Sequence, residues 1–298
     1  MAFAGVDFSD SDDQSEPVPL NWAKTFWRSN WKLYSCAVRP SDEGTETPDV
    51  EEARRGTMQQ ARTSWRERLD QLAEEFLTVA RAANPDLYAP DKHEALTGIA
   101  YRVLRDLLVL IGYPALWAME HGASYIRNLV EARIVFKWLV LKNDPELYSR
   151  FKSYGRGRLK LLELHLEEYR DGLGDPPSDL DAQIEYLQAL VNQDIWKEFQ
   201  EISIEGNFAG VDTRKMAEQV GILTEYRLIF APASANVHGE WAALDQYALT
   251  VCKDPLHRNH RIPRDDARIL LGPELVETAL NHVSALVDDY VDNWSHVN

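Results

Sequence analysis

The stretch that decides the fold is Ala115–Lys142, ALWAMEHGASYIRNLVEARIVFKWLVLK. Apolar side chains occupy positions all around the helix that this sequence favours, so little of its surface suits water. A stripe of hydrogen-bonding side chains interrupts them, at spacings that place all of its members on one helical face. This polar stripe consists of Glu120, Ser124, Arg127, Asn128 and Glu131. We expect the stripe to point into the protein interior or into a cleft.

Arg127 and Glu131 stand four residues apart, a spacing that lets their side chains form an ion pair. A buried arginine is costly unless it is paired, and the other polar side chains of the stripe can supply further hydrogen bonds. Two interpretations follow: a structural ion-pair network in a helical core, or the wall of an active site. Under the first, Arg127→Ala should cost several kcal/mol, because it leaves Glu131 buried without a partner.

The composition limits the classes of function. The chain has 298 residues, 45% of them hydrophobic, which is enough for a substantial core, and its net charge of -16 argues against a broad nucleic-acid surface. A local basic pocket for RNA is still allowed. We expect no membrane segment, since no apolar run approaches about 20 residues. Two distant cysteines, Cys36 and Cys252, and the absence of a secretory signal favour a cytoplasmic protein.

Common catalytic and cofactor motifs are missing from the sequence. It contains no GxxxxGK[ST] loop, no GxGxxG after a strand, no HExxH and no GxSxG. The histidines of His257-Arg-Asn-His260-Arg261 have no nearby carboxylate ligands, so a solvated basic loop is favoured there over a metal site. We therefore expect neither a metal nor a cofactor.

Residues 1–49 differ in composition from the rest of the chain. They comprise an acidic arm, an aromatic and basic segment that contains Trp22, Trp27 and Trp31, and a linker. The aromatic segment is interpreted either as a segment docked on the core or as a helix that binds a protein partner or stacks on bases. Residues 50–298 are expected to form one helical bundle domain.

Apolar residues recur every three or four positions through most of residues 50–298, which indicates helices. We predict helices over about Val50 to Ala83, Asp91–Ile111, Ala115–Asn143, Asp212–Val220 and Ile222–His238. A further helix has Asp144 as its N-cap and runs to about Arg170, one or two helices lie within Ser178–Ile204, and the last helix begins at Pro273. Within Gly239–Gly272 the pattern is irregular: Trp241–Lys253 suits a helix or a short hairpin, and Asp254–Asp266 a basic loop. The predicted fold is an all-α multi-helix bundle with an acidic N-terminal arm and an irregular segment near the C-terminus.

A second group of candidate residues lies in Tyr226–Gly239, where Tyr226, Ser234 and His238 share one face of the predicted helix. Gly239 suits a helix C-terminus, where the helix dipole favours a protonated histidine. Such a histidine can transfer protons or bind an anionic group, and it can equally be a core or capping residue. Lys152 opens the most basic run of the chain, which either offsets its acidic surroundings or lines the phosphate side of a pocket.

Arg127-Asn-Leu-Val-Glu131 together with Ser234-Ala-Asn-Val-His238-Gly239 resembles an uncharacterised bacterial helical family, the domain of unknown function 5677, over roughly residues 95–295. In that family an arginine and a glutamate recur on one helix and a serine and a histidine on another. They match Arg127, Glu131, Ser234 and His238. The resemblance implies a helical bundle in which these motifs converge, and it implies no particular activity.

A more distant similarity is to the helical HEPN ribonucleases, which cut RNA without a metal in toxin or phage-defence settings, often at a homodimer interface. Those enzymes carry the arginine and histidine close together on one helix, whereas Arg127 and His238 are far apart in sequence, and the closer Arg158/His165 pair lacks the usual polar residue after the arginine.

Two hypotheses for function remain. In the first, the protein cleaves RNA: Arg127 holds a phosphate, Glu131 fixes Arg127, His238 transfers a proton, and Ser234 and Tyr226 orient the substrate. In this hypothesis the remaining stripe residues and Lys152 would contact substrate. In the second, the protein is a non-catalytic binding or assembly module, in which the same residues form a buried structural network.

Overall fold

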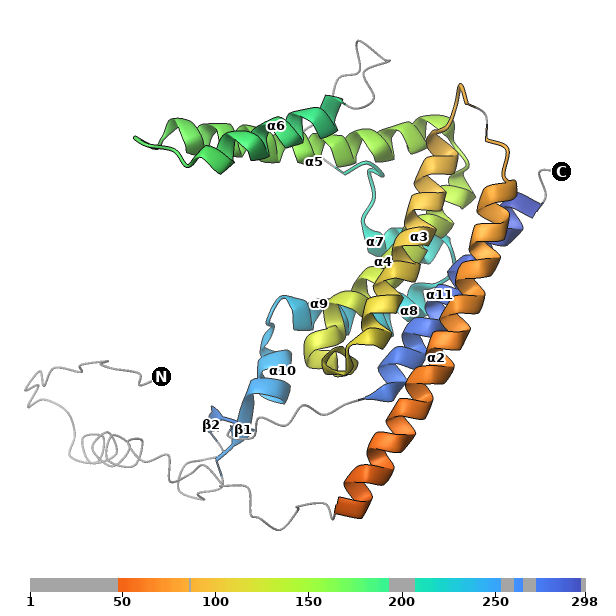
Figure 1. Cartoon of the computed structure of the whole chain (residues 1–298), viewed down its shortest axis with the longest axis vertical. Helices are drawn as coiled ribbons and strands as arrows, with labels where there is room; N and C mark the ends of the chain where they lie inside the picture. Colours follow the sequence, from red (N-terminus) through yellow and green to blue (C-terminus); the bar gives the residue numbers. More distant parts are fainter. Residues whose placement is uncertain (1–47, 86, 193–206, 253–259, 265–271, 296–298) are drawn as a thin grey trace, which may run out of the picture. The chain divides into compact units, whose positions relative to one another are not determined.

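The computed structural model describes residues 48–85, 87–192, 207–252, 260–264 and 272–295 (Figure 1). The long elements are the helices α2 (Pro48–Ala82), α3 (Asp91–Gly112), α4 (Met119–Lys142), α5 (Pro145–Asp171), α6 (Ser178–Asn192) and α11 (Pro273–Ser295). The short ones are η2 (Pro114–Trp117), α7 (Thr213–Gln219), α8 (Leu223–Glu225), η3 (Tyr226–Phe230), α9 (Ala231–Val237), α10 (Trp241–Ala243), η4 (Leu244–Ala248), β1 (Leu249–Val251) and β2 (Arg261–Pro263). The predicted all-α multi-helix fold is confirmed.

The chain divides into two compact units. The described residues 48–85, 87–192, 207–242 and 272–295 form the helical bundle, and the described residues 243–252 and 260–264 belong to the other unit. In that second unit β1 and β2 pair antiparallel, with Leu249 opposite Pro263 and Val251 opposite Arg261. The prediction of a loop over 254–266 is therefore wrong for β2, whose backbone groups are paired with β1. Of the alternatives left open for Trp241–Lys253, the segment has short helical turns followed by the single strand β1, whose partner β2 lies outside it.

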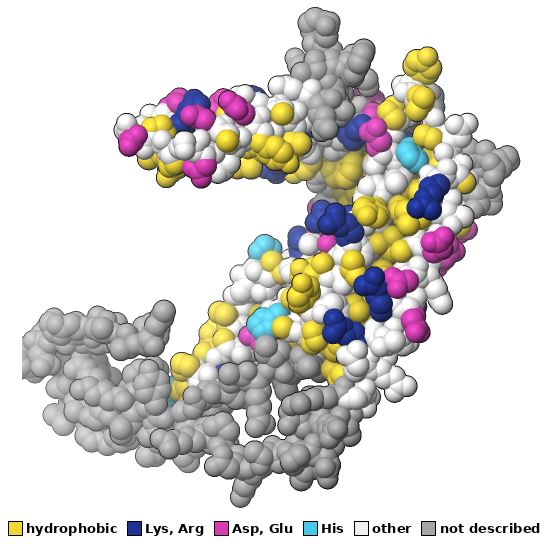
Figure 2. Space-filling model, viewed as in Figure 1, with side chains coloured by type: hydrophobic (Ala, Val, Ile, Leu, Met, Phe, Trp, Pro, Cys, Tyr) yellow, Lys and Arg dark blue, Asp and Glu magenta, His cyan; other side chains and the backbone are white. Residues whose placement is uncertain are grey.

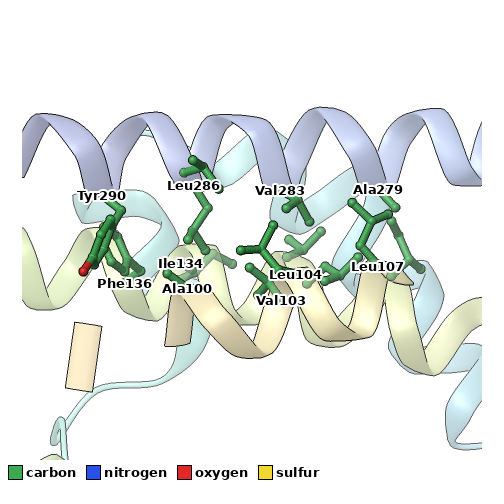
Figure 3. Packing of buried hydrophobic residues seen from close by; sticks show 14 of the residues in the cluster. Ala100, Val103, Leu104, Leu107, Ile134, Phe136, Ala279, Val283, Leu286 and Tyr290 are labelled. Atoms are coloured by element: carbon green, nitrogen blue, oxygen red, sulfur yellow. The ribbon is translucent and has the colours of Figure 1, made fainter. Parts of the chain in front are cut away.

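The core of the bundle forms around α11, which packs against α2, α3 and α4. Seven side chains of α11 are at most 1% exposed: Val276, Ala279, Leu280, Val283, Leu286, Val287 and Tyr290. Figure 3 shows several of them meeting Leu104 and Leu107 of α3 and Ile134 and Phe136 of α4. Each large side chain buried in this way contributes about 1.5–3 kcal/mol to the free energy of unfolding. The packing of α3, α4 and α11 therefore supplies much of the stability.

The two ends of α4 are fixed by local signals that the sequence carries. Before α4, the indole nitrogen of Trp117 donates to the carbonyl of Leu110 at 2.8 Å, which ties η2 back to α3. After α4, Asn143 adopts the left-handed conformation with φ 43°, and the Asp144 carboxylate accepts from the backbone N–H of Glu146 at 3.0 Å. The predicted N-cap at Asp144 is confirmed.

Several predictions fall on residues that the structure does not describe. They include the segment with Trp22, Trp27 and Trp31 and the end of the predicted helices in Ser178–Ile204, where α6 stops at Asn192. Among the residues that are described, no helix has both the length and the hydropathy needed to cross a membrane.

Candidate functional site

Helix α9 lies along the first half of α4, and this contact brings the two sequence motifs to one interface. The side-chain amide of Asn236 donates to the carbonyl of Met119 at 3.3 Å. One and a half turns earlier along this segment, the Phe230 ring lies 5.0 Å from the guanidinium carbon of Arg127. Because higher numbers on one element meet lower numbers on the other, α9 runs antiparallel to α4. We call the exposed side chains along this contact the α4–α9 surface.

The Arg127 guanidinium is held from two sides. Its Nη1 lies 3.3 Å from a carboxylate oxygen of Glu131, and its Cζ lies over the Phe230 ring, 5.0 Å from the ring centroid. Phe230 in turn stacks on Tyr226, with ring centroids 5.0 Å apart. The Nε of Arg127 is buried and has no hydrogen-bond partner among the described residues. This packing fixes the arginine while leaving further N–H groups that can donate to a ligand.

The expectation that the whole polar stripe points into the interior or a cleft is wrong. Glu120 and Ser124 are exposed, and the side chains of Arg127 and Glu131 keep 26% and 33% of their accessible surface. The reason lies in the neighbours of α4: helices α3, α7, α9 and α11 cover its apolar sides, and the stripe occupies what they leave open. Asn128, next to Arg127, is half-buried.

His238 lies at the C-terminus of α9, as the sequence predicts, and its side chain is exposed. Gly239 follows with φ +63°, and the N–H groups of Gly239 and Glu240 bond back to the carbonyls of Asn236 and Ala235. This is the Schellman arrangement, which needs a residue that tolerates the left-handed conformation. Ser234 lies one turn before His238 and is half-buried.

The predicted single α-helix over Ile222–His238 is interrupted by the π-helical turn η3. A π turn adds one residue to the helix, which rotates everything after it by about 100° relative to an unbroken α-helix. Tyr226 stacks on Phe230, the residue that contacts Arg127, whereas Ser234 and His238 lie further along the chain. From Phe230 to His238 the chain rises by about 12 Å, toward the start of α4.

Lys152 lies elsewhere. Its amine bonds to the carboxylates of Asp91, at 2.7 Å, and Glu94, in the first turn of α3. That end of α3 adjoins the end of α4, since Lys92 donates to Asn143 at 2.8 Å. Lys152 therefore ties α5 to α3, and the structure does not bring it to the α4–α9 surface.

A second polar cluster joins α4 to α8 and α11, and the sequence analysis did not identify it. Arg133 is 15% exposed, and its Nη1 lies 3.4 Å from Nδ1 of His282 and 3.9 Å from a carboxylate oxygen of Glu225. Lys137 donates to both carboxylate oxygens of Asp289, at 3.0 and 3.2 Å. His282 is only 7% exposed. We call these five residues the α4–α11 charge cluster.

Burial of the imidazole lowers the pKa of His282 below its ordinary 6.5, and the positive charge of Arg133 adds to this effect, while Glu225 opposes it. The histidine is therefore neutral near pH 7, and Arg133 can donate to its unprotonated Nδ1. The only signal of this cluster in the sequence is residue spacing. Arg133 and Lys137 stand four residues apart, and His282 and Asp289 stand seven residues apart. Within the described part of the chain, no three metal-ligating side chains gather.

Comparison with known protein families gives a match. Neither a curated protein nor a solved structure matches the sequence. The model of a family of unknown function, DUF5677, matches residues 96–254, which run from α3 to just beyond β1 and include both α4 and α9. Since this match covers more than half of the chain, the protein belongs to that family of unknown function.

Proposed function

We propose that the α4–α9 surface binds single-stranded RNA and cleaves it without a metal ion. In this proposal Arg127 binds a backbone phosphate, and Glu131 and Phe230 hold Arg127 in place. At a neighbouring phosphodiester His238 accepts the proton of the ribose 2′-hydroxyl, whose oxygen attacks the phosphorus to form a 2′,3′-cyclic phosphate, while the 5′-oxygen leaves and takes a proton from water. Ser234 and Tyr226 orient the strand between them, with Asn128, Ser124 and Glu120 at its edge. The roughly 12 Å of helix rise between Phe230 and His238 suits a ligand longer than one nucleotide.

One observation carries this proposal: the antiparallel packing of α9 on α4, defined by the contacts of Phe230 with Arg127 and of Asn236 with Met119. It places an oriented guanidinium, a hydroxyl and an exposed imidazole along one interface. An exposed histidine can exchange protons with solvent, as acid/base catalysis requires. An arginine held by a carboxylate and a ring is pre-oriented for a phosphate.

The electrostatics favour a local contact over an extended one. On the face shown in Figure 2, the described Lys and Arg side chains are interspersed with acidic and hydrophobic ones and form no continuous basic area. A strand that binds through few phosphates should show a shallow salt dependence, because the number of counterions released grows with the number of phosphates neutralised. We further propose that the protein acts in the cytoplasm, as a toxin or in defence against phage. We propose that it does so as a homodimer.

The experiment is to incubate the purified full-length protein with a mixed pool of single-stranded RNA and to follow its degradation. His238→Ala should lower the cleavage rate by about 100-fold or more, because the proton-transfer step is lost. His165→Ala is the matched control, since His165 is also exposed but lies on α5. Equal rates for wild type and His238→Ala would remove the proposal.

The alternative is a non-catalytic binding or assembly module, and the stacking of Arg127 on Phe230 favours it, because this contact also attaches α9 to α4. In that case Arg127 variants should change the melting temperature, and no RNA degradation should occur. Cross-linking of wild type and of a Trp22→Ala/Trp27→Ala/Trp31→Ala variant in cell extract tests whether the aromatic segment binds a protein partner.

A further inference from the structure

Helices α5 and α6 lie alongside each other (Figure 1). Four side chains of α6, spaced three or four residues apart, are at most 8% exposed and form its buried side: Leu180, Ile184, Leu187 and Val191. No other described element packs extensively against α6. This buried side therefore faces α5, and we call the two helices the α5–α6 arm.

Polar side chains bridge the two helices along one side of the arm. The side-chain amide of Gln188 donates to the Glu167 carboxylate at 3.2 Å, and Arg170 donates to Asp181 at 3.3 Å. Because higher numbers on α5 meet lower numbers on α6, the helices run antiparallel. Glu167 and Gln188 mark the polar side of the arm.

The opposite side of the arm is apolar. On α5, Leu162 and Tyr169 stand about 140° and 160° around the helix from Glu167. On α6, Tyr186 stands about 160° around the helix from Gln188, and so does Leu190. These side chains, together with Leu166, which lies between Leu162 and Tyr169 on α5, form what we call the apolar face of the arm.

The apolar face is open to solvent. Leu162 is 47% exposed, Tyr169 61% and Tyr186 64%. Leu166 and Leu190 are half-buried. Large apolar side chains gathered on one face in this way are typical of a surface that binds another protein.

The two ends of the apolar face carry opposite charges. Arg158, one turn before Leu162, is exposed and donates to the neutral hydroxyl of Tyr154 at 2.8 Å. Beyond Tyr169, Asp175 and Asp179 are both exposed. Two copies of the arm that pack face to face and antiparallel therefore bring the basic end of one against the acidic end of the other. Twofold symmetry forms this contact twice, whereas parallel packing would bring like charges together.

We propose that the apolar face binds a second copy of this chain, so that the two arms form an antiparallel four-helix bundle. Burial of Leu162, Tyr169 and Tyr186 on both copies drives the association. Arg158 of one copy against Asp175 of the other sets its direction. The inference rests on the homodimer proposed above, whose interface it assigns, and it does not require that RNA be cleaved.

The test is sedimentation equilibrium of the full-length protein at about 2 to 100 µM, because self-association depends on protomer concentration. With rising concentration, wild type should approach the mass of two chains of 34.1 kDa each. Leu162→Lys should weaken the association by about tenfold or more, since it places a charge from each copy in an apolar interface.

Leu164→Lys is the matched control. Leu164 is also partly exposed, at 37%, but it stands about 160° around α5 from Leu162, away from the apolar face. It should associate as wild type does, and circular dichroism should show both variants folded. A wild type that stays monomeric at every concentration would overturn the proposal, as would equal association of Leu162→Lys and Leu164→Lys.

Charge reversal tests the antiparallel direction. Arg158→Glu and Asp175→Arg should each weaken the association by about threefold to tenfold, and the double variant should recover it, because the contact forms again with the signs exchanged. A double variant that associates more weakly than both single variants would contradict the antiparallel arrangement.

RNA degradation by the same samples separates this proposal from the proposed function. His238→Ala should remain dimeric, since His238 lies at the end of α9 and outside the arm. A dimeric wild type that leaves RNA intact would contradict only the cleavage. A monomeric wild type that degrades RNA would contradict only the interface.

Discussion

The Arg133 guanidinium and the His282 imidazole lie 3.4 Å apart between α4 and α11, where burial and, after it, the charge of Arg133 lower the pKa of the histidine. The contact is attractive only while Nδ1 of His282 carries a lone pair. After protonation, two cations would face each other in a site where His282 is 7% exposed, with Glu225 and Asp289 each 3.9 Å from the Arg133 guanidinium.

The first prediction concerns pH. His282 has a lowered pKa in the folded protein, so the unfolded chain binds more protons near pH 6.5 and below. The stability that this group contributes is therefore complete above about pH 6.5 and is lost as the pH falls below it, by at most about 1.4 kcal/mol per pH unit. Urea unfolding of wild type and His282→Gln at pH 7.5, 6.5 and 5.5 measures this loss.

We expect a smaller decrease in the free energy of unfolding between pH 7.5 and 5.5 for His282→Gln than for wild type. His165→Gln, which changes an exposed histidine, should keep the wild-type pH dependence. A parallel decrease in wild type and His282→Gln would show that His282 does not titrate on unfolding in this range.

The second prediction concerns the close approach of Gly122 to the turn before α4. A Cβ at this position would lie 2.1 Å from the Leu116 carbonyl oxygen and 2.7 Å from a methyl carbon of Leu275. Gly122→Ala should therefore destabilise the protein by about 3 kcal/mol, because backbone must move to admit the methyl group. Thermal and urea unfolding measure the change.

Gly98 provides the matched control for this substitution. It also lies inside a long helix, α3, but a Cβ there would meet nothing within 4 Å. Gly98→Ala should stabilise the protein by about 0.5–1 kcal/mol, since alanine loses less backbone entropy in a helix. A stable Gly122→Ala protein with unchanged unfolding would mean that α4 does not approach Leu116 as described.

Much of the fold could be predicted because its helices carry local signals. The apolar period of α2, α3 and α11 and the N-cap at Asp144 lie within each segment, so the sequence alone indicates them. The π turn η3 could not be predicted. Its extra residue lies where Phe230 packs on α4. A π turn at this place therefore depends on a tertiary contact, which spacing along the chain does not reveal.

The direction of the polar stripe on α4 illustrates the limit of spacing arguments. Spacing correctly groups Arg127 with Glu131 on one face, but it does not tell which faces neighbouring helices cover. The α4–α11 charge cluster was missed for the same reason. Arg133 and Lys137 meet His282 and Asp289 only after α11, about 150 residues later in sequence, packs on α4.

The third prediction tests the Lys137–Asp289 pair between α4 and α11, whose side chains are 26% and 28% exposed. Lys137→Met and Asp289→Asn should each destabilise the protein, and the double variant should be less destabilised than the sum. We expect a coupling energy of about 1 kcal/mol, as for a partly screened pair. Additive effects would show that the pair does not contribute to the attachment of α11 to α4.

The last prediction concerns Arg127 and Phe230. Because Glu131 is 33% exposed, loss of its partner should cost far less than the several kcal/mol expected for a buried carboxylate. Arg127→Lys keeps the charge but loses the planar contact with the Phe230 ring, which should cost about 0.5–1 kcal/mol. In a Phe230→Leu background the same substitution should cost less, since the ring is already absent. Equal costs in the two backgrounds would show that the ring does not hold the guanidinium, and the pre-oriented phosphate contact would then lose its structural basis.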